Sequence, residues 1–262
     1  MIKLFGYVGR MFFTFLQDLS SLTYLFGETV SQTVALFSDR TKFRKTNVLQ
    51  AVDEVGTHSL PLVLIVTSLL GIALTVLISF QLKELGGLSY IPGFVSVAIF
   101  REMGPLITAL IVAGRVGAAI TARIGTMKVS EEILALETMA INPVRFLVVQ
   151  RFIGLLIALP ALTVLGSFTA VLGGFLFGST RLGIRPDTYV RETLEVLSFT
   201  DVASGVVKAT VFAMAIVMIG CYRGLVVEGS AEEVGKSTMI SVVWSTLAII
   251  ILDTVMTTAF YG

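Results

Sequence analysis

The chain alternates long apolar runs with short polar segments, and five of these runs are long enough to cross a bilayer. A hydrocarbon core about 30 Å thick needs roughly 20 consecutive apolar residues in helical form. The five predicted spans are Leu60–Phe80, Phe94–Ile120, Ile153–Gly178, Val202–Tyr222 and Thr238–Phe260. We therefore predict an all-α, polytopic membrane protein whose five-helix transmembrane domain covers residues 49–262.

The first 48 residues have a different pattern. Ile2–Phe37 is rich in Phe, Leu and Tyr, but charged and polar residues interrupt it at Arg10, Gln17, Asp18 and Glu28. This mixture is typical of helices that lie in the plane of the membrane interface, and the basic run Arg40–Lys45 would then lie among headgroups. We predict an N-terminal region of one or two interfacial amphipathic helices over residues 1–48, in preference to a sixth span.

A polar island, Thr126–Pro143, separates the second and third spans. It predicts a short amphipathic helix over residues 130–140. Ser130 is placed to cap the first turn, and Glu131 and Glu132 suit the positive end of the helix dipole. The apolar side of this helix consists of Ile133, Leu134, Leu136 and Met139. We expect the helix to lie at the membrane surface and to be held by a partner protein.

The distribution of Lys and Arg predicts the orientation. With the N-terminus in the cytoplasm, twelve Lys or Arg residues flank the spans on the inner side and four on the outer side. Cytoplasmic loops carry such an excess. The sequence therefore predicts a cytoplasmic N-terminus, a periplasmic C-terminus and a cytoplasmic polar island.

Four charged residues fall inside the predicted spans at a similar depth, namely Arg101, Glu102, Lys208 and Asp253. With a rise of about 1.5 Å per residue, each lies roughly 10–12 Å from the outer end of its helix. Charges inside a membrane are expensive unless they are paired or hydrated, so they indicate function by default. Two interpretations stay open: a cluster that only holds the bundle together, and the polar waist of a cavity that receives an amphipathic molecule.

Composition narrows the possible functions. The chain is 55% hydrophobic and 14% charged, with a formal net charge of +1, which argues against nucleic-acid binding. The single cysteine, Cys221, and the single histidine, His58, exclude a disulfide framework and leave little for a metal site or for catalysis. Gly229–Ser237 resembles a phosphate-binding loop, but five residues separate its glycines where four are required, so we predict a turn there.

Small residues recur every four positions on the third span, at Gly166, Ala170, Gly174 and Gly178. Such a stripe lets helices approach closely. The sequence does not decide between packing within one chain and a seam between two copies.

Two adjacent segments carry a family resemblance. Arg101–Met127 reads R-E-M-G-P-L-I-T-A-L-I-V-A-G-R-V-G-A-A-I-T-A-R-I-G-T-M, and Ser130–Phe146 reads S-E-E-I-L-A-L-E-T-M-A-I-N-P-V-R-F. With the C-terminal L-D-T-V-M-T-T-A-F around Asp253, they resemble the MlaE/YrbE family of ABC-transporter permeases. The likeness extends over most of the chain. Three positions depart from the usual pattern: Glu132, Asn142 and Gln150.

The resemblance implies a permease of the bacterial inner membrane. It would work as a homodimer with two cytoplasmic ATPase subunits and a periplasmic ring of MCE-domain subunits. It would move phospholipids between the inner membrane and that ring, and so maintain the lipid asymmetry of the outer membrane. ATP and magnesium would be bound by the ATPase, so this chain would need no cofactor, metal or catalytic residue.

The resemblance also implies roles for particular residues. The helix over residues 130–140 would be the coupling helix seated in the ATPase, with contacts from Ser130, Glu131, Glu132, Ile133, Leu136 and Glu137. Arg101, Glu102, Lys208 and Asp253 match the charged cavity positions of the family. We further expect lipid-tail contacts from Leu70, Leu74, Leu77, Ile78 and Leu88, because a diacyl lipid needs apolar walls.

Two other classes of function remain as alternatives. An ion-coupled secondary transporter of an amphipathic substrate would use Glu102 or Asp253 as a proton site, but it predicts internal repeats that the five spans lack. The other is a membrane scaffold without transport activity; purification separates it from the ABC transporter, which requires a co-purifying ATPase.

Overall fold

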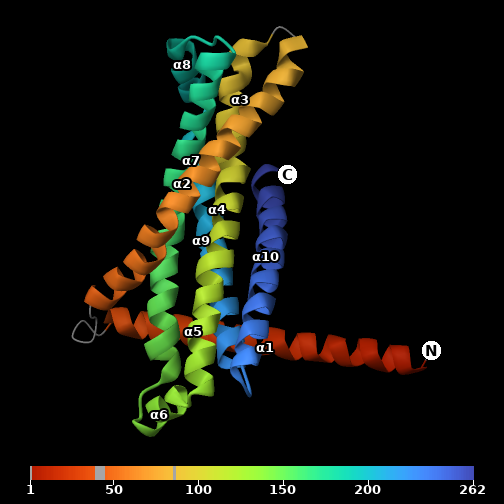
Figure 1. Cartoon of the computed structure of the whole chain (residues 1–262), viewed down its shortest axis with the longest axis vertical. Helices are drawn as coiled ribbons and strands as arrows, with labels where there is room; N and C mark the ends of the chain where they lie inside the picture. The colour runs from red at the N-terminus through yellow and green to blue at the C-terminus, as the bar shows by residue number, and fades with distance from the viewer. Residues whose placement is uncertain (1, 39–44, 85–86) are drawn as a thin grey trace.

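A computed structural model describes residues 2–38, 45–84 and 87–262, and the regular elements in these ranges are helices (Figure 1). Five segments are long and apolar enough to span a membrane. They are Val52–Lys83, Leu88–Val129, Val144–Arg181, Phe199–Leu225 and Ala231–Tyr261. Each contains one predicted span, which confirms the all-α, five-span prediction. The helices are longer than the apolar runs because their polar flanks are helical as well.

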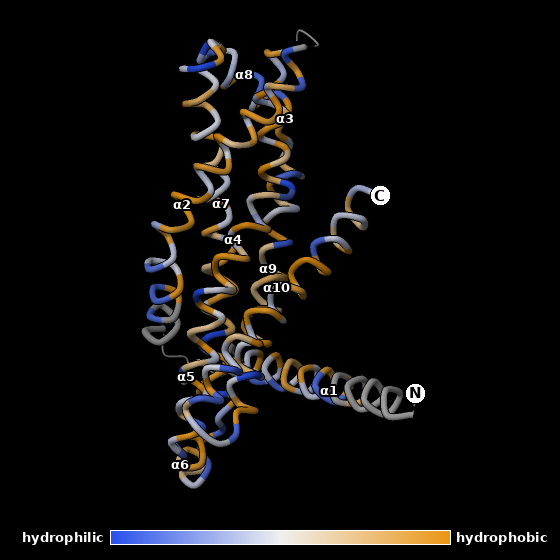
Figure 2. The backbone as a smooth tube through the Cα atoms, turned by 45° about the vertical axis from the view of Figure 1, so that its right-hand side comes forward, coloured by the Kyte–Doolittle hydropathy of each residue, from blue (hydrophilic) through white to orange (hydrophobic). Residues whose placement is uncertain are grey.

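The helices are arranged as a bundle of long elements with short helices at both ends. The N-terminal helix is α1 (Ile2–Ser38), and the first span lies in α2 (Lys45–Glu84). The second span consists of η1 (Leu88–Tyr90), α3 (Ile91–Ala98), η2 (Ile99–Met103), α4 (Gly104–Val112), η3 (Ala113–Gly117) and α5 (Ala118–Val129). The other elements are α6 (Glu132–Thr138), η4 (Val144–Val148), α7 (Val149–Arg181), α8 (Pro186–Val196), α9 (Phe199–Leu225) and α10 (Ala231–Tyr261). Apolar positions predominate along the spans, and hydrophilic positions gather near α6 and α8 (Figure 2).

The helix α1 is a single element that lies across one end of the bundle, at a steep angle to the spans (Figures 1 and 2). Asp18 anchors it by accepting hydrogen bonds from the Tyr222 hydroxyl at 2.7 Å and from Arg223 Nη2 at 3.2 Å. The Phe26 ring packs edge-on against Phe152 of α7, with centroids 6.3 Å apart. In the predicted basic run Arg40–Lys45, residues 40–44 lie outside the described residues.

The small-residue stripe packs within the chain: Gly166, Ala170 and Gly174 lie against α2, and Gly178 lies against Tyr189 of α8. A Cβ atom on Gly71 of α2 would lie 1.8 Å from the Ala170 carbonyl oxygen, and one on Gly174 would lie 2.6 Å from Thr75 Oγ1. A Cβ on Gly166 would lie 3.0 Å from Val63. The two helices therefore touch backbone to backbone, and the stripe is used for contact inside one chain.

The second span is continuous but contains two π-helical segments, η2 and η3. The first ends directly before Gly104-Pro105, where the proline lacks the N–H that an α-helix needs. Such bulges are frequent at functional sites because they redirect side chains. This one carries both Arg101 and Glu102.

Candidate functional site

Three of the four predicted intramembrane charges form one cluster between the second, fourth and fifth spans. Lys208 of α9 has a fully buried side chain, and it pairs with Glu102 of η2 and with Asp253 of α10. The distance from Lys208 Nζ to Asp253 Oδ1 is 3.0 Å. The predicted layer is therefore a real constellation, drawn from three helices far apart in sequence.

All three donors of the Lys208 ammonium are used. The third goes to Thr257 Oγ1 at 2.7 Å, and Thr257 in turn donates to Glu102 Oε1 at 2.7 Å. Two carboxylates thus share one ammonium. The Glu102 side chain keeps 29% of its surface exposed, whereas Lys208 has none, so the carboxylate is the part of the cluster open to a ligand.

Arg101 does not join this cluster. Its Nε lies 2.6 Å from Asp201 Oδ1, and its guanidinium lies 4.6 Å from the centre of the Tyr261 ring. The four predicted residues therefore do not form one paired set, because Arg101 has a partner of its own. The physical reason is the direction of the side chains. Adjacent residues in a helix point to different sides, so Arg101 and Glu102 contact different neighbours.

Sequence analysis did not identify Asp201. It was placed just outside the fourth span, although the structure buries its side chain to 2% exposure. Its other oxygen accepts a hydrogen bond from the Ser198 N–H at 2.9 Å and completes a capping box at the start of α9. The spacing of Ser198 and Asp201 is the recognisable signal of such a box. Asp201 therefore caps the helix and pairs with Arg101.

A glycine brings α9 close enough for the cluster to form. A Cβ atom on Gly205 would lie 2.4 Å from the Phe100 carbonyl oxygen of η2. Gly205 and Lys208 are three residues apart and share one face of the helix. Close approach at Gly205 therefore places Lys208 against Glu102.

The predicted lipid-tail residues have different surroundings. Leu74, Ile78 and Leu88 are partly buried and pack against a core cluster that contains Ile91 and Tyr189. Leu70 is also partly buried, whereas the Leu77 side chain is 59% exposed. Within this set, Leu77 is the residue freest to meet an acyl chain.

The polar island forms the helix α6, but its start differs from the prediction. Ser130 ends α5 and does not cap α6; its hydroxyl donates to the Thr126 carbonyl or to Glu132 Oε1, each at 2.9 Å. Glu131 takes the capping position in a left-handed conformation, with φ of 60°. The predicted cap at Ser130 is therefore wrong. It failed because α5 continues beyond the apolar run and uses Ser130 for its own C-terminal turn.

The helix α6 has an exposed, charged face and an apolar face that packs against the bundle. Ile133 is buried, and Leu136 packs against the main core, whereas Leu134 and Met139 are exposed. The side chains of Glu131, Glu132 and Glu137 are all exposed. The element projects beyond α1 at that end of the bundle (Figure 1).

Comparisons with known proteins agree with this architecture. The family model for the permease MlaE matches residues 48–259. A probable ABC transporter permease of Rickettsia felis is 34% identical over 254 residues, which is 97% of this chain and 96% of the relative. The intermembrane phospholipid transport system permease MlaE of Haemophilus influenzae is 32% identical over 215 residues, 79% of this chain and 80% of the relative.

A plant relative extends the comparison. The chloroplast protein TRIGALACTOSYLDIACYLGLYCEROL 1 of Arabidopsis thaliana is 32% identical over 220 residues, which cover 84% of this chain and 63% of the plant protein. The match of the family model covers the five spans almost completely. The chain therefore belongs to the MlaE permease family and is a membrane-spanning permease subunit of an ABC transporter.

Proposed function

We propose that this permease moves phospholipids between the inner membrane of a bacterium and a periplasmic MCE-domain partner, driven by a separate ATPase. The observation that carries the proposal is the cluster of Lys208, Glu102 and Asp253 among apolar spans. Polar groups of this kind suit a headgroup, while the surrounding apolar walls suit acyl chains. The names of the relatives from Haemophilus influenzae and Arabidopsis thaliana support a lipid substrate.

We further propose that α6 receives the motion of the ATPase. It is short, carries Glu132 and Glu137 on its surface, and is separated by only two residues from α5, the last segment of the span that bears Glu102. Movement of α6 would pass along the second span to the charged cluster. In this scheme two copies of the chain, each with one ATPase, enclose the lipid cavity.

The orientation follows from the same scheme. We place α1 and α6 on the cytoplasmic side, with α1 in the headgroup layer, and α8 and the C-terminus on the periplasmic side. The excess of Lys and Arg near α1 and α6 supports this orientation.

The test is reconstitution of the permease with its ATPase in liposomes and measurement of ATP-dependent transfer of a labelled phospholipid. The double variant Glu131→Lys/Glu132→Lys is expected to retain ATP hydrolysis but lose lipid transfer. Glu232→Lys/Glu233→Lys is the matched control, because it reverses two exposed charges at the same end of the bundle. Equal transfer by the first variant and the wild type would contradict the role of α6.

A second candidate is an ion-coupled transporter, favoured by one observation: Glu102 and Asp253 share a single ammonium, which leaves room for a proton. It is tested in liposomes that contain the permease without an ATPase. Lipid transfer driven by a proton gradient alone would support this candidate and refute the ABC mechanism.

A further inference from the structure

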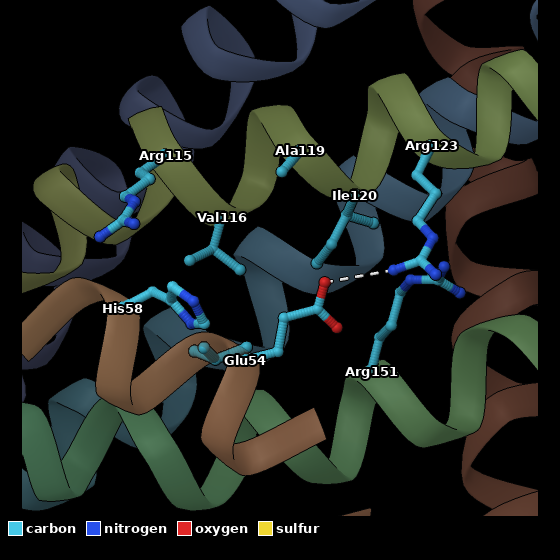
Figure 3. A pocket seen from close by; sticks show the side chains of 9 residues that line it. Glu54, His58, Arg115, Val116, Ala119, Ile120, Arg123 and Arg151 are labelled. Carbon is cyan, nitrogen blue, oxygen red and sulfur yellow. Dashed lines mark hydrogen bonds and ion pairs between the residues drawn. The ribbon is translucent and has the colours of Figure 1, made fainter. Parts of the chain in front are cut away.

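A second polar site lies far from the charged cluster. A cavity of about 320 Å³ lies between the start of α2, the second span and α7. Its polar lining comes from Glu54, His58, Arg115, Arg123 and Arg151. Figure 3 shows Arg115 and His58 at one end of the cavity, Arg123 and Arg151 at the other, and Glu54 between them.

The cavity holds more positive than negative charge. Glu54 Oε1 pairs with Arg123 Nη1 at 3.1 Å, and Arg151 donates to the Leu147 carbonyl. Arg115 has no ion pair or hydrogen bond within the described part of the chain. Arginine stays charged in proteins, so it cannot relieve the excess by losing a proton. An unbalanced cation within a membrane span is a functional signal.

The position of α1 gives the depth of the cavity. The Phe26 ring of α1 packs on Phe152, the residue after Arg151, so Arg151 lies at the level of α1. We place α1 in the headgroup layer of the cytoplasmic leaflet. Arg115 and Arg123 are eight residues apart, or about 12 Å along the helix. The cavity therefore runs from the headgroup layer of the cytoplasmic leaflet into the part of the acyl region next to it.

The cavity continues into a neighbouring one. A second hollow of about 330 Å³ is also lined by Glu54, Arg123 and Arg151, and Gln50 and Gln150 add polar groups to its wall. Towards Arg115 the wall is apolar, from Val116, Ala119 and Ile120. The end of the cavity at the membrane surface is thus polar, and an apolar wall lies between it and the deeper polar end at Arg115 and His58.

Resting on the orientation proposed above, we propose that this cavity binds the phosphate of a phospholipid from the cytoplasmic leaflet, through Arg123 and Arg151, which lie side by side at one end of it (Figure 3). Guanidinium groups bind phosphate oxygens with paired, charge-assisted hydrogen bonds. The phosphate would supply the missing negative charge, and the Ala119 wall would contact the glycerol and the first methylenes. Arg101 and Arg115 are fourteen residues apart, about 21 Å along the span, so this site is separate from the charged cluster.

The test is native mass spectrometry of the full-length chain, purified in its natural complex and titrated with phosphatidylglycerol. Arg123→Gln and Arg151→Gln are each expected to weaken binding about tenfold, the effect of one lost charge-assisted hydrogen bond. Ala119→Phe keeps all the arginines but fills the cavity, so it is expected to weaken binding as well. Arg181→Gln is the matched control, since it removes an exposed arginine at the far end of α7.

Two further ligands identify the source of the phosphate. Diacylglycerol with the same acyl chains lacks the phosphate and is expected not to compete. Glycerol 3-phosphate lacks the chains and is expected to compete only weakly; competition as strong as that of the lipid would overturn the assignment to a membrane lipid. Wild-type affinity for phosphatidylglycerol in both Arg151→Gln and Ala119→Phe would overturn the site itself.

These measurements need no ATP hydrolysis and no lipid transfer, so their failure is distinct from failure of the proposed function. One other outcome would also refute the proposal. If Arg123→Gln releases the ATPase from the complex while lipid binding is unchanged, the arginine serves a protein contact.

Discussion

Lys208 Nζ lies 3.0 Å from Asp253 Oδ1, and this contact joins the fourth span to the fifth inside the membrane. Glu102 of the second span completes the set. A buried ion pair is weak evidence for stability by itself, because desolvation offsets much of the attraction. The arrangement is therefore better judged by variants that separate folding from transport.

Lys208→Met is expected to leave two carboxylates without their cation. Breaking one partner of a buried pair lowers stability by about 3–5 kcal/mol, so the thermal unfolding midpoint in detergent should fall and lipid transfer should cease. Thr257→Val removes only a neutral hydroxyl from the cluster and should have a smaller effect.

The triple variant Lys208→Met/Glu102→Gln/Asp253→Asn separates the two roles of the cluster. Removing all three charges together should restore most of the stability, because no uncompensated charge remains. Lipid transfer should stay absent if the charges act on the substrate. Normal transfer by the triple variant would mean that the cluster only holds the bundle together.

Arg101 and Asp201 should behave as a coupled pair. Their contact is 2.6 Å long and one partner is buried, so the effects of Arg101→Gln and Asp201→Asn on the unfolding midpoint should not add. We expect a coupling energy of about 0.5–3 kcal/mol in a double-mutant cycle. Arg185 and Asp187 form an exposed pair at 3.2 Å and provide the comparison, with an expected coupling below about 1 kcal/mol. Equal coupling in the two pairs would contradict the importance of burial.

Gly205→Ala should disrupt the approach of α9 to η2. The new Cβ would lie 2.4 Å from the Phe100 carbonyl oxygen, so the helices must separate and the contact between Lys208 and Glu102 should weaken. We expect a fall in stability of about 1–3 kcal/mol, as for overpacking in a core. Gly114→Ala is the control, because nothing lies within 4 Å of its added Cβ. The control should be neutral or slightly more stable, because alanine favours a helix more than glycine does. A fall of the same size in the control would show that the contact at Gly205 is not the cause.

The end of α6 holds a residue in a left-handed conformation. Ala140 has φ of 58°, a conformation that glycine adopts without the steric penalty of a Cβ. Ala140→Gly should therefore stabilise this turn by about 0.5–1 kcal/mol and slow amide hydrogen exchange in α6. Ala135→Gly, inside the same helix, should have the opposite effect, since glycine destabilises a helix interior. Faster exchange in the first variant would show that the turn does not limit opening of α6.

The candidate site was predictable in part. A charged residue within an apolar run is easily recognised in a sequence, which is why the sequence indicates Arg101, Glu102, Lys208 and Asp253. Their partners are not visible in this way. Asp201 lies at the boundary of a span, where a carboxylate is unremarkable until the fold buries it.

The polar island shows a second limit of sequence reasoning. The existence of a short helix follows from its amphipathic pattern, and the structure contains it as α6. Its first residue does not follow, because Ser130 is equally suited to end one helix or to begin the next. The position of the turn between α5 and α6 depends on the length of α5 and on the burial of Ile133, which fixes how α6 packs.

The sequence by itself determined the class of protein, the five spans and the charges they carry, because the thickness of a bilayer sets the length of each apolar run. The tertiary structure alone decided which charges pair, that the small-residue stripe of α7 meets α2, and that arginines from two helices share one cavity. Those outcomes depend on how the helices pack and on the direction of each side chain, which hydrophobic periodicity does not specify.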